Sequence, residues 1–455
     1  MKIKLPATVK AVLDSLHAAG YEAYAVGGCV RDSILGRRPD DWDITTSALP
    51  EQVKAIFNRT VDTGIAHGTV TVLIGSKAHE VTTYRIDGTY KDGRHPEEVT
   101  FTASLPEDLK RRDFTINAMA YNEEEGLVDL HGGLEDLQKK MVRCVGDPME
   151  RFSEDALRIL RAVRFSAQLN FGIDRDTVAG IIRLAPNLSK ISAERICTEL
   201  VKLITSDHPD YLKVAYEAGI TRIVLPEFDA MMETPQNNPH HCYTVGEHTL
   251  KSMCAVEADR VLRLTMLFHD MGKPSCRTTD AEGIDHFKGH GPVSAEMAGT
   301  IMRRLRMDNA AIRKVTTLVR YHDWRIEPEE KAVRRAMNKI GTELFPLLIK
   351  VQNADTLAQS AEYMTLKLQR IIEVSLISEK ILQSRQCVGL KDLKITGQDI
   401  LALGCRPGPK VGVLLNSALE EVLDDPEKNN REYLLEFIRN RLYAESLPQE
   451  PDSRP

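Results

Sequence analysis

The sequence places two aspartates one residue apart in the stretch RPDDWDI, residues 38–44. If this stretch is a β-strand, residues two apart point to the same face of the sheet. We therefore expect the carboxylates of Asp41 and Asp43 to aim together, with Trp42 on the opposite side. Two hard oxygen donors at this spacing suit Mg²⁺, and two such ions can stabilise the attacking and leaving oxygens of an in-line displacement.

A glycine pair lies upstream, in the stretch VGGCVRD, residues 26–32. Residues 24–26 are predicted to form a short buried strand, after which Gly27 and Gly28 let the backbone approach a ligand closely. A helix is expected over residues 30–35 with Gly36 as its C-terminal cap, and its N-terminus would suit phosphate oxygens. A lone Gly-Gly is usually a turn and a lone Asp-x-Asp a solvated loop, but their order here favours a site for nucleotidyl transfer.

Two further strands are expected over residues 70–74 and 79–83, because both runs alternate and are rich in β-branched residues. If the second strand lies beside the strand of the two aspartates, Glu80 could supply a third carboxylate. The polar stretch 85–96 contains two glycines and is predicted to be a mobile loop. After about residue 135, helical spacing of apolar residues dominates.

The composition bounds the class of protein. At 455 residues the chain is too long for one ordinary domain, and its 42% hydrophobic and 28% charged residues are typical of a soluble globular protein. The eight cysteines contain no CxxC pair, which indicates a reduced, cytoplasmic chain rather than a disulfide or zinc scaffold. No stretch approaches the roughly 18 apolar residues of a membrane span.

The net charge of the chain is −6, so any binding of nucleic acid would depend on local clusters of basic residues. Two such clusters, at residues 110–112 and 158–164, lie beside other motifs.

The first of these clusters belongs to the stretch RRDFTINAMA, residues 111–120. We expect it to enter a helix and to place guanidinium groups on triphosphate oxygens in bidentate geometry. Asp113 could accept a hydrogen bond from a ribose hydroxyl. An exposed, charged helix start is the alternative interpretation.

The second cluster belongs to the stretch EDALRILRAVRF, residues 154–165. On a helix, Asp155 and Arg158 would share a face and present an acceptor beside a donor. Cytosine and adenine both carry an amino donor beside a ring-nitrogen acceptor, whereas guanine and uracil carry the reverse. Such a pair would accept C and A and refuse G and U, since the wrong base leaves buried polar groups unpaired. An ordinary intrahelical ion pair remains the alternative.

Together these motifs resemble those of class II tRNA nucleotidyltransferases, the CCA-adding branch of the polymerase-β superfamily. The resemblance runs from residue 20 to about 205 and includes the stretch ERICTEL, residues 194–200. It implies addition of CCA to the 3′ end of tRNA from CTP and ATP. The implied metal-binding catalytic residues are Asp41, Asp43 and Glu80. The implied nucleotide-binding residues are Gly27, Gly28, Arg31, Arg112, Asp113, Asp155, Arg158, Arg161 and Arg164.

Four alternatives to this interpretation of the head motifs are considered. Poly(A) polymerases share most of them but carry extra basic sequence that is not found here. A partial, CC- or A-adding enzyme is a second alternative, and a relative that adds only CC is expected to lack the loop at 85–96, which in the family helps the switch from CTP to ATP. A chain whose N-terminal half only binds RNA would lack some head motifs, and a pure binding module would not cluster carboxylates without metal.

A second constellation falls in residues 240–360, where seven of the chain's thirteen histidines and an adjacent His-Asp pair occur. It resembles the HD superfamily of metal-dependent phosphohydrolases. By that resemblance, a divalent transition metal of unknown identity would be bound by His248, His269, Asp270 and Asp355. His290 and His322 could hold a second ion or a substrate phosphate, and a helical scaffold without turnover is the alternative. His240, His241 and Cys242 are interpreted as linker.

The expected architecture is an α+β head with a small mixed sheet, followed by an all-α neck, an HD domain and a helical tail. The predicted boundaries are 1–140 for the head, 141–225 for the base-recognising neck, 226–370 for the HD domain and 371–455 for a tRNA-binding tail. A linker is expected at 226–241, because prolines and asparagines gather there. The last seven residues are expected to be disordered. No membrane partner is expected, and the sequence sets no oligomeric state.

Overall fold

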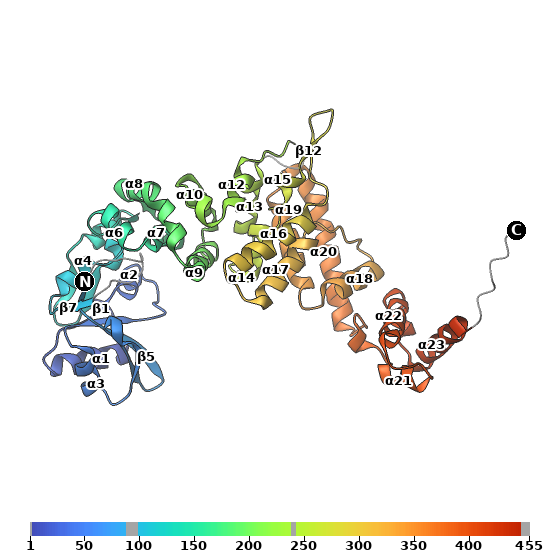
Figure 1. The fold of residues 1–455 in the computed structure, drawn as a ribbon, viewed down its shortest axis with the longest axis horizontal. Coiled ribbons are helices and arrows are strands. Elements are labelled where there is room, and N and C mark those ends of the chain that lie inside the picture. Colours follow the sequence, from blue (N-terminus) through green and yellow to red (C-terminus); the bar gives the residue numbers. More distant parts are fainter. Residues whose placement is uncertain (1, 88–98, 238–242, 447–455) are drawn as a thin grey trace. The chain divides into compact units, whose positions relative to one another are not determined.

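A computed structural model describes residues 2–87, 99–237 and 243–446 (Figure 1). The chain divides into two compact units. Unit 1 comprises Met1–Glu233 with Ile301–Asp308, and unit 2 comprises Thr234–Thr300 with Asn309–Pro455. The loop expected at 85–96 and the linker residues His240, His241 and Cys242 fall largely or wholly outside the described residues, as does the C-terminal tail after residue 446.

Unit 1 begins with a seven-stranded mixed sheet in the order β3-β4-β5-β2-β1-β8-β9, as the α+β prediction requires. The pairing of β2 with β5 is parallel, and the other pairings are antiparallel. The strands are β1 Ala23–Val26, β2 Asp43–Thr46, β3 Thr60–Gly64, β4 Thr69–Ile74, β5 Lys77–Thr83, β8 Met119–Asn122 and β9 Gly126–Asp129.

The two faces of this sheet are covered differently. One face packs on α1, Ala7–Ala18, and α3, Pro50–Ile56, with Ile44 and Val81 in the shared aliphatic core (Figure 1). The other face carries Tyr24 and Val26 and packs on α4, Leu105–Lys110. Because side chains alternate along a strand, the neighbours of Ile44 and Val81 point to the α4 face. That face therefore receives the side chains of Asp43 and Glu80.

Short elements complete the head. The strands β6, Arg85–Asp87, and β7, Val99–Phe101, pair with each other and flank the undescribed residues. The remaining elements are α2 Gly28–Ile34, η1 Ile65–His67, η2 Thr115–Asn117 and α5 Gly133–Gln138. The expectation that residues 111–120 enter a helix is wrong. Arg111 caps the end of α4, and the segment continues through η2 into the buried strand β8.

The rest of unit 1 is helical, apart from the two-residue parallel pair of β10, Met141–Val142, and β11, Gly172–Ile173. Its helices are α6 Pro148–Glu154, α7 Leu157–Leu169, α8 Arg175–Leu184, η3 Ala185–Lys190, α9 Ala193–Ile204, η4 Pro209–Tyr211, α10 Leu212–Glu217, α11 Thr221–Val224 and α12 Pro226–Glu233. The linker expected from residue 226 is wrong in its first half. Pro226 begins α12, where a proline at the first turn costs no helical hydrogen bond.

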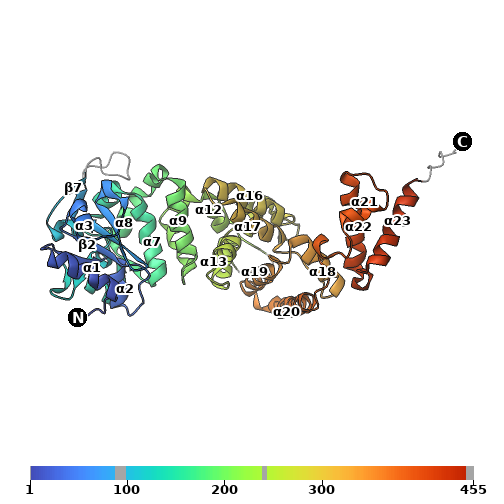
Figure 2. The ribbon, with the colours of Figure 1, turned by 90° about the horizontal axis from the view of Figure 1, so that it is seen from below.

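Helices also dominate the second half of the chain, as Figure 2 shows. They are α13 Val245–Cys254, α14 Arg260–Phe268, α15 Lys273–Cys276, α16 His290–Arg304, α17 Asn309–Tyr321, α18 Glu330–Ile340, α19 Phe345–Leu357, α20 Ala361–Gln383, η5 Leu390–Asp392, α21 Gly397–Ala402, α22 Pro409–Asp424, η6 Pro426–Lys428 and α23 Arg431–Ser446. A short hairpin of β12, Thr278–Thr279, and β13, Asp285–His286, is the sole strand pair described in unit 2. Aliphatic cores lie between α18, α19 and α20 and between α21, α22 and α23.

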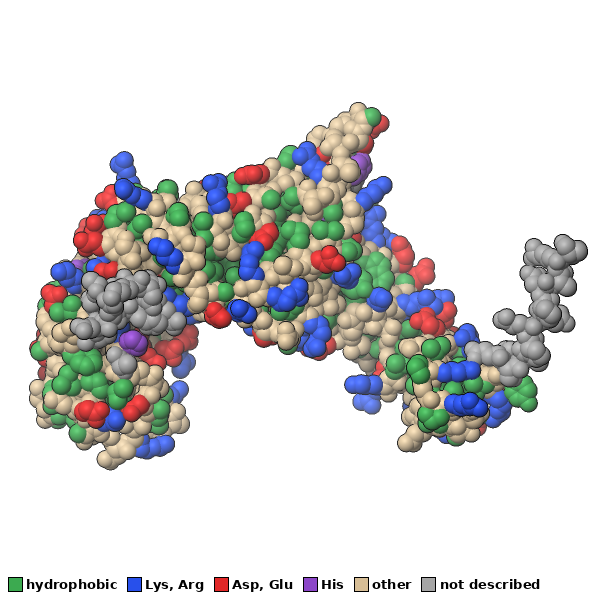
Figure 3. All heavy atoms as spheres, in the orientation of Figure 1, with side chains coloured by type: hydrophobic (Ala, Val, Ile, Leu, Met, Phe, Trp, Pro, Cys, Tyr) green, Lys and Arg blue, Asp and Glu red, His purple; other side chains and the backbone are tan. Residues whose placement is uncertain are grey.

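The surface carries charges of both signs. On the face drawn in Figure 3, basic and acidic side chains are interspersed with hydrophobic ones. Among the described helices, none is both long enough and apolar enough to cross a membrane.

Candidate active site in unit 1 and metal centre in unit 2

The paired aspartates lie at the start of the central strand β2. Asp43 is the first residue of β2, and Trp42 packs against the aliphatic core on the other face, as expected. Asp41 is outside the strand, so the prediction that both aspartates share a strand is wrong for Asp41. The pairing of β1 with β2 puts Asp43 opposite Val26, next to the glycine turn that follows β1.

Glu80 lies on the neighbouring strand β5, as the sequence predicted. The parallel register sets Ile44 beside Val81, which brings Asp43 beside Glu80 one position earlier. Partial removal from water and the negative charges of Asp43 and Asp41 raise the pKa of Glu80. Removal from water also raises the pKa of Asp43; nearby Arg112 opposes the rise and Asp41 adds to it. Three carboxylates that disfavour one another's charge fit a site for divalent cations.

The glycine turn has the backbone that only glycine adopts easily. Gly27 has a φ of +83°, and α2 begins at Gly28, two residues before the predicted start. A Cβ atom on Gly27 would lie 3.3 Å from Nη1 of Arg112. The guanidinium of Arg112 is therefore held directly against the turn. Gly36, with a φ of +71°, follows the end of α2 as predicted.

The two arginines assigned to the triphosphate are both held by other side chains. Arg31 binds Asp32 through Nε at 2.8 Å and Asn117 Oδ1 through Nη1 at 2.7 Å. Arg112 lies 3.2 Å from Asp108 through Nη2. These contacts fix the guanidinium groups before any ligand arrives.

Asp113 has four donors around its carboxylate. Oδ1 accepts from the backbone N–H of Phe114 at 2.9 Å and from Asn117 Nδ2 at 3.2 Å. Oδ2 accepts two N–H groups of Arg161 at 2.8 and 2.6 Å. A ribose hydroxyl could reach this carboxylate by displacing one of these donors.

The predicted base-reading pair is arranged differently from the expectation. Asp155 lies between α6 and α7 with an extended backbone, so the prediction that it shares one helix face with Arg158 is wrong. Asp155 instead forms an ion pair with Arg195 of α9 at 2.7 Å. Arg158 binds Glu154 at 2.5 Å and donates to the carbonyl of Arg111 at 3.0 Å.

The other two arginines of the cluster surround one ring. The guanidinium carbons of Arg31, Arg161 and Arg164 lie 5.1, 5.3 and 3.9 Å from the ring centroid of the buried Phe165. Arg164 also pairs with the buried Glu199 at 2.5 Å. The arginines on α7 are thus packed into the protein rather than spread over a solvated face.

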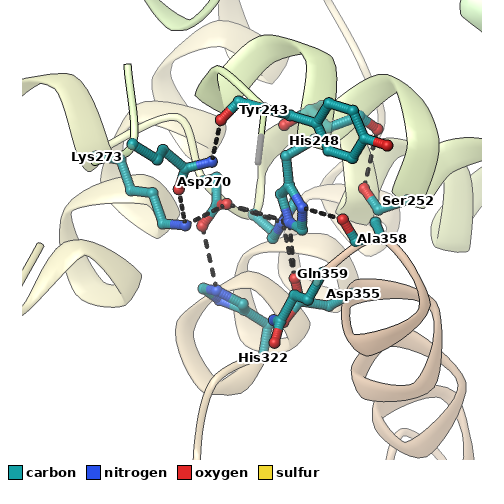
Figure 4. A network of polar contacts seen from close by, with 12 residues as sticks. Tyr243, His248, Ser252, Asp270, Lys273, His322, Asp355, Ala358 and Gln359 are labelled. Atoms are coloured by element: carbon teal, nitrogen blue, oxygen red, sulfur yellow. Dashed lines mark hydrogen bonds and ion pairs between the residues drawn. The ribbon is translucent and has the colours of Figure 1, made fainter. Parts of the chain in front are cut away.

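In unit 2, the structure brings all six residues of the predicted HD constellation together (Figure 4). Nε2 of His248 lies 2.8 Å from Asp355 Oδ1 and 3.3 Å from His269 Nε2. Nε2 of His290 lies 3.1 Å from His322 Nε2. All but Asp355 are among the buried residues.

The four imidazoles are oriented by the backbone. Nδ1 of each ring faces a carbonyl oxygen, at 3.3 Å for His248, 2.7 Å for His269, 2.8 Å for His290 and 2.8 Å for His322. This contact places the proton on Nδ1 and leaves the Nε2 lone pair directed inward. Two such lone pairs facing each other at 3.3 Å need a cation or a proton between them.

Asp270 stands between the two histidine pairs. Its Oδ2 lies 3.2 Å from His269 Nε2, and its Oδ1 lies 3.2 Å from His290 Nε2. Lys273 Nζ approaches Oδ2 at 2.8 Å. Neither oxygen of this buried carboxylate makes a hydrogen bond of regular geometry within the described chain. The donor set therefore fits two divalent ions that share Asp270, and N and O ligands of this kind suit transition metals.

Comparisons with known proteins identify the family of the chain. Three family models match, described as "Poly A polymerase head domain" over residues 23–143, "Probable RNA and SrmB-binding site of polymerase A" over 170–232 and "tRNA nucleotidyltransferase domain 2" over 290–438. The CCA-adding enzyme of Enterococcus faecalis is 34% identical over 431 residues, which is 94% of this chain and 95% of that one. The chain belongs to the CCA-adding enzyme family.

Other members of the CCA-adding enzyme family match in part or in structure. The enzyme of Limosilactobacillus reuteri is 55% identical over 213 residues, so the match spans about half of its length, 53%, and 46% of this chain. The crystal structure of the Bacillus stearothermophilus CCA-adding enzyme in complex with CTP has 30% identity and a TM-score of 0.72. It covers 98% of this chain and 100% of its own.

Two residues at these sites, Arg195 and Lys273, carry no role in the sequence motifs. Arg195 lies in the stretch 194–200, which resembles the last family motif. Its partner Asp155 is 40 residues away, so the spacing of residues within either segment does not predict the ion pair. Lys273 lies only three residues after Asp270, across the turn between α14 and α15, so this contact is local in the sequence.

The contacts of Asp113 predict a pH-dependent contribution to stability. Burial would raise its pKa, but Arg161 outweighs burial and lowers the pKa from 3.8 to about 2. A carboxyl with a lowered folded-state pKa stabilises the fold above pH 4, and this stabilisation is lost as the pH falls toward 2. Asp113→Asn is expected to lower the free energy of unfolding at pH 7 by about 2 kcal/mol.

Urea unfolding tests this prediction. The chain has two tryptophans, so a Trp324→Phe background leaves Trp42 as the fluorescent reporter of unit 1. The difference in the free energy of unfolding between Asp113→Asn and the parent protein should become smaller as the pH falls below 4. Asp176→Asn, at an exposed site of α8, is the control and should change little. A difference in unfolding free energy that stays constant with pH would contradict a lowered pKa of Asp113.

Proposed function

We propose that the chain adds C, C and A to the 3′ end of tRNA, using CTP and ATP and no nucleic-acid template. The observation that carries this proposal is the arrangement around β2. Asp43 lies beside Glu80 on one side and beside the Gly27 turn on the other, with Arg112 held against that turn. Membership of the CCA-adding enzyme family supports the choice of substrates.

In the proposed reaction, the 3′-hydroxyl of tRNA attacks the α-phosphorus of the nucleotide. A new O–P bond forms as pyrophosphate leaves. Asp41, Asp43 and Glu80 hold the catalytic cations. Bound Mg²⁺ would supply charge stabilisation for the attacking and leaving oxygens. The backbone N–H of Gly28 binds the triphosphate. Gly27, whose own N–H donates to the carbonyl of Met119 at 3.2 Å, lets the backbone approach the triphosphate closely.

The proposed contacts to the rest of the nucleotide come from side chains. Arg31 and Arg112 donate to phosphate oxygens, and Asp113 receives a ribose hydroxyl in exchange for one of its present donors. Asp155 accepts the amino group of C or A in exchange for its present donor Arg195, while Arg158 donates to the adjacent ring nitrogen in exchange for one of its present acceptors. Arg161 and Arg164 add positive charge around this site and brace it through Phe165. Residues 141–225 are assigned to the neck, which recognises the base. Residues 371–455 are assigned to the tail, which binds tRNA.

Incorporation assays test the activity. The protein is incubated with Mg²⁺, each labelled NTP, and tRNA that either lacks CCA or ends in CC. Incorporation limited to C, C and A is expected. Asp41→Ala with Asp43→Ala should reduce it by at least about 10³-fold, since two of the three carboxylates of the metal site are lost.

The other outcomes of this assay decide against the proposal. Long A tails would indicate a poly(A) polymerase, and C addition that stops before A would indicate a partial enzyme. A double variant that still adds CCA would contradict the metal site. Asp62→Ala, at an exposed position on β3, is the control for general effects of removing an acid.

Arg158→Ala tests the base assignment. Loss of its guanidinium removes the donor to the ring nitrogen, so discrimination against GTP and UTP should fall by about tenfold or more. The measurement is the ratio of kcat/KM for CTP and UTP on tRNA lacking CCA. Arg183→Ala, at an exposed position on α8, is the control. Unchanged discrimination would contradict the donor and acceptor assignment.

A second candidate function is a metal-dependent phosphohydrolase in unit 2, assigned to residues 226–370. The inward-facing Nε2 atoms of the four histidines around Asp270 favour it. We assign one ion to His248, His269, Asp270 and Asp355, and a second ion to Asp270, His290 and His322. A bound divalent metal would supply an activated water for attack on a phosphoester.

Metal titration tests this centre without reference to turnover. The background carries Asp41→Ala and Asp43→Ala, so that the head site is removed. Calorimetry with Mn²⁺ should show two ions per chain, one ion after His322→Ala and none after Asp270→Ala. His286→Ala, which changes an exposed histidine bound to Asp280, should retain both ions. Full binding by the Asp270 variant would overturn the assignment.

A further inference from the structure

A buried carboxylate that belongs to none of the motifs above lies beneath the triphosphate site. Asp108 of α4 has no solvent-exposed side-chain surface. Its Oδ1 accepts from Nε of Arg111 at 3.1 Å and from Nη2 at 2.7 Å. Its Oδ2 lies 3.2 Å from Nη2 of Arg112 and accepts from Oγ1 of Thr45 at 3.2 Å. A buried charge of this kind is tolerated because it is paired and hydrogen-bonded.

Through Thr45, this carboxylate is tied to the strand of the catalytic aspartates. Thr45 lies two residues after Asp43 on β2, so both side chains point to the same face of the sheet. The hydroxyl of Thr45 also reaches the carbonyl of Thr82 at 3.3 Å, two residues after Glu80 on β5. Asp108 therefore touches the strand pair that carries the metal-binding carboxylates.

Through Arg112, the same carboxylate is tied to the glycine turn. Nη2 of Arg112 faces Asp108, while Nη1 lies against Gly27. One carboxylate faces two guanidinium groups, so Asp108, Arg111 and Arg112 together carry one positive charge. Burial would raise the pKa of Asp108, but Arg112 and Arg111 outweigh it and hold the pKa below its ordinary value. The carboxylate is thus charged at neutral pH.

A third contact joins the end of α4 to Arg158, the residue assigned to the base. The carbonyl of Arg111, whose side chain Asp108 holds, accepts a hydrogen bond from Arg158 at 3.0 Å. The end of α4 thereby lies in contact with the residue assigned to reading C and A. A shift of Arg111 and Arg112 would move the triphosphate donors relative to both the carboxylates and the base site.

We propose that Asp108 is a positioning residue for nucleotide transfer, which orients Arg112 toward the β- and γ-phosphates of the incoming nucleotide. This inference rests on the proposed nucleotidyl transfer by unit 1. Asp108 does not touch the nucleotide and acts through Arg112. Its removal is expected to weaken binding of the triphosphate selectively, rather than binding of the base and sugar.

The test is equilibrium binding of CTP and of CMP, with kinetics in parallel. Asp108→Asn keeps the shape and removes the charge, so the Kd and KM for CTP should rise about tenfold. Binding of CMP, which lacks the β- and γ-phosphates, should change less than about twofold, since its contacts do not involve Arg112. A residue needed only for folding would affect both nucleotides alike.

A double-mutant cycle adds a second readout. Once Arg112→Ala has removed the guanidinium, Asp108→Asn should have little further effect on the Kd for CTP. Additive effects, an unchanged Kd for CTP, or equal losses of CTP and CMP would overturn the proposal. Binding is measured without tRNA, so a wild-type protein that binds CTP but does not add it would contradict the proposed function alone.

Two further variants keep the test decisive. Asp285→Asn is the matched control, because Asp285 is a buried carboxylate of unit 2 that also accepts from an arginine and a threonine, Arg277 and Thr279. It should leave the Kd for CTP unchanged. If Asp108→Asn does not fold, Thr45→Val removes one bond to the same carboxylate and should raise the Kd for CTP by about threefold with CMP unchanged. No change in Thr45→Val would overturn the proposal.

Discussion

The parallel pairing of β2 with β5 is the constraint on which the proposed active site depends. β2 is antiparallel to β1 and parallel to β5, so the start of β2 is flanked by the end of β1 and by Glu80. A shift of one residue in this register would turn Glu80 to the face of the aliphatic core. That core, in which α1 and α3 pack on Ile44 and Val81, therefore also fixes the positions of the carboxylates on the opposite face.

Around these carboxylates, the protein arranges positive charge in advance of the ligand. Arg31, Arg112, Arg158 and Arg161 each have at least one acidic or carbonyl partner that holds the guanidinium in place. Preorganised donors are effective because they need not be reoriented as charge develops in the reaction. The cost is that several carboxylates, including Asp108 and Asp113, must be buried and paired. Unit 2 uses backbone carbonyls for the same purpose and orients four imidazoles with them.

Much of this could be predicted from the sequence, because the informative signals are local. Alternation of β-branched residues predicted β4 and β5, and the Gly-Gly turn and its helix followed from the conformational freedom of glycine. The HD residues were grouped correctly, although they come from several helices, because their resemblance to a known family supplied the long-range information. Glu80 was expected beside Asp43 only if the two strands paired, and the structure shows that they do.

The wrong predictions of secondary structure have one physical cause. Contacts between distant segments decide the backbone conformation against the local spacing of residues. Residues 154–165 have helical spacing throughout, yet the helix breaks at Asp155, whose carboxylate pairs with Arg195 of α9. Residues 111–120 look like a helix start, yet they run from the end of α4 through the short η2 to the beginning of strand β8 at Met119. Partners that lie 40 or more residues apart, such as Asp155 with Arg195 or Thr45 with Asp108, leave no mark in the spacing of either segment.

The central claim is that the carboxylates at the start of β2 bind the catalytic cations next to the Gly27 turn. Anomalous diffraction from crystals grown with Mn²⁺ and CTP tests it most directly. The account predicts manganese between the carboxylates of Asp41 and Asp43, with the triphosphate against Gly27 and Gly28. Triphosphate bound elsewhere, or crystals with CTP in place but no manganese at these aspartates, would contradict it.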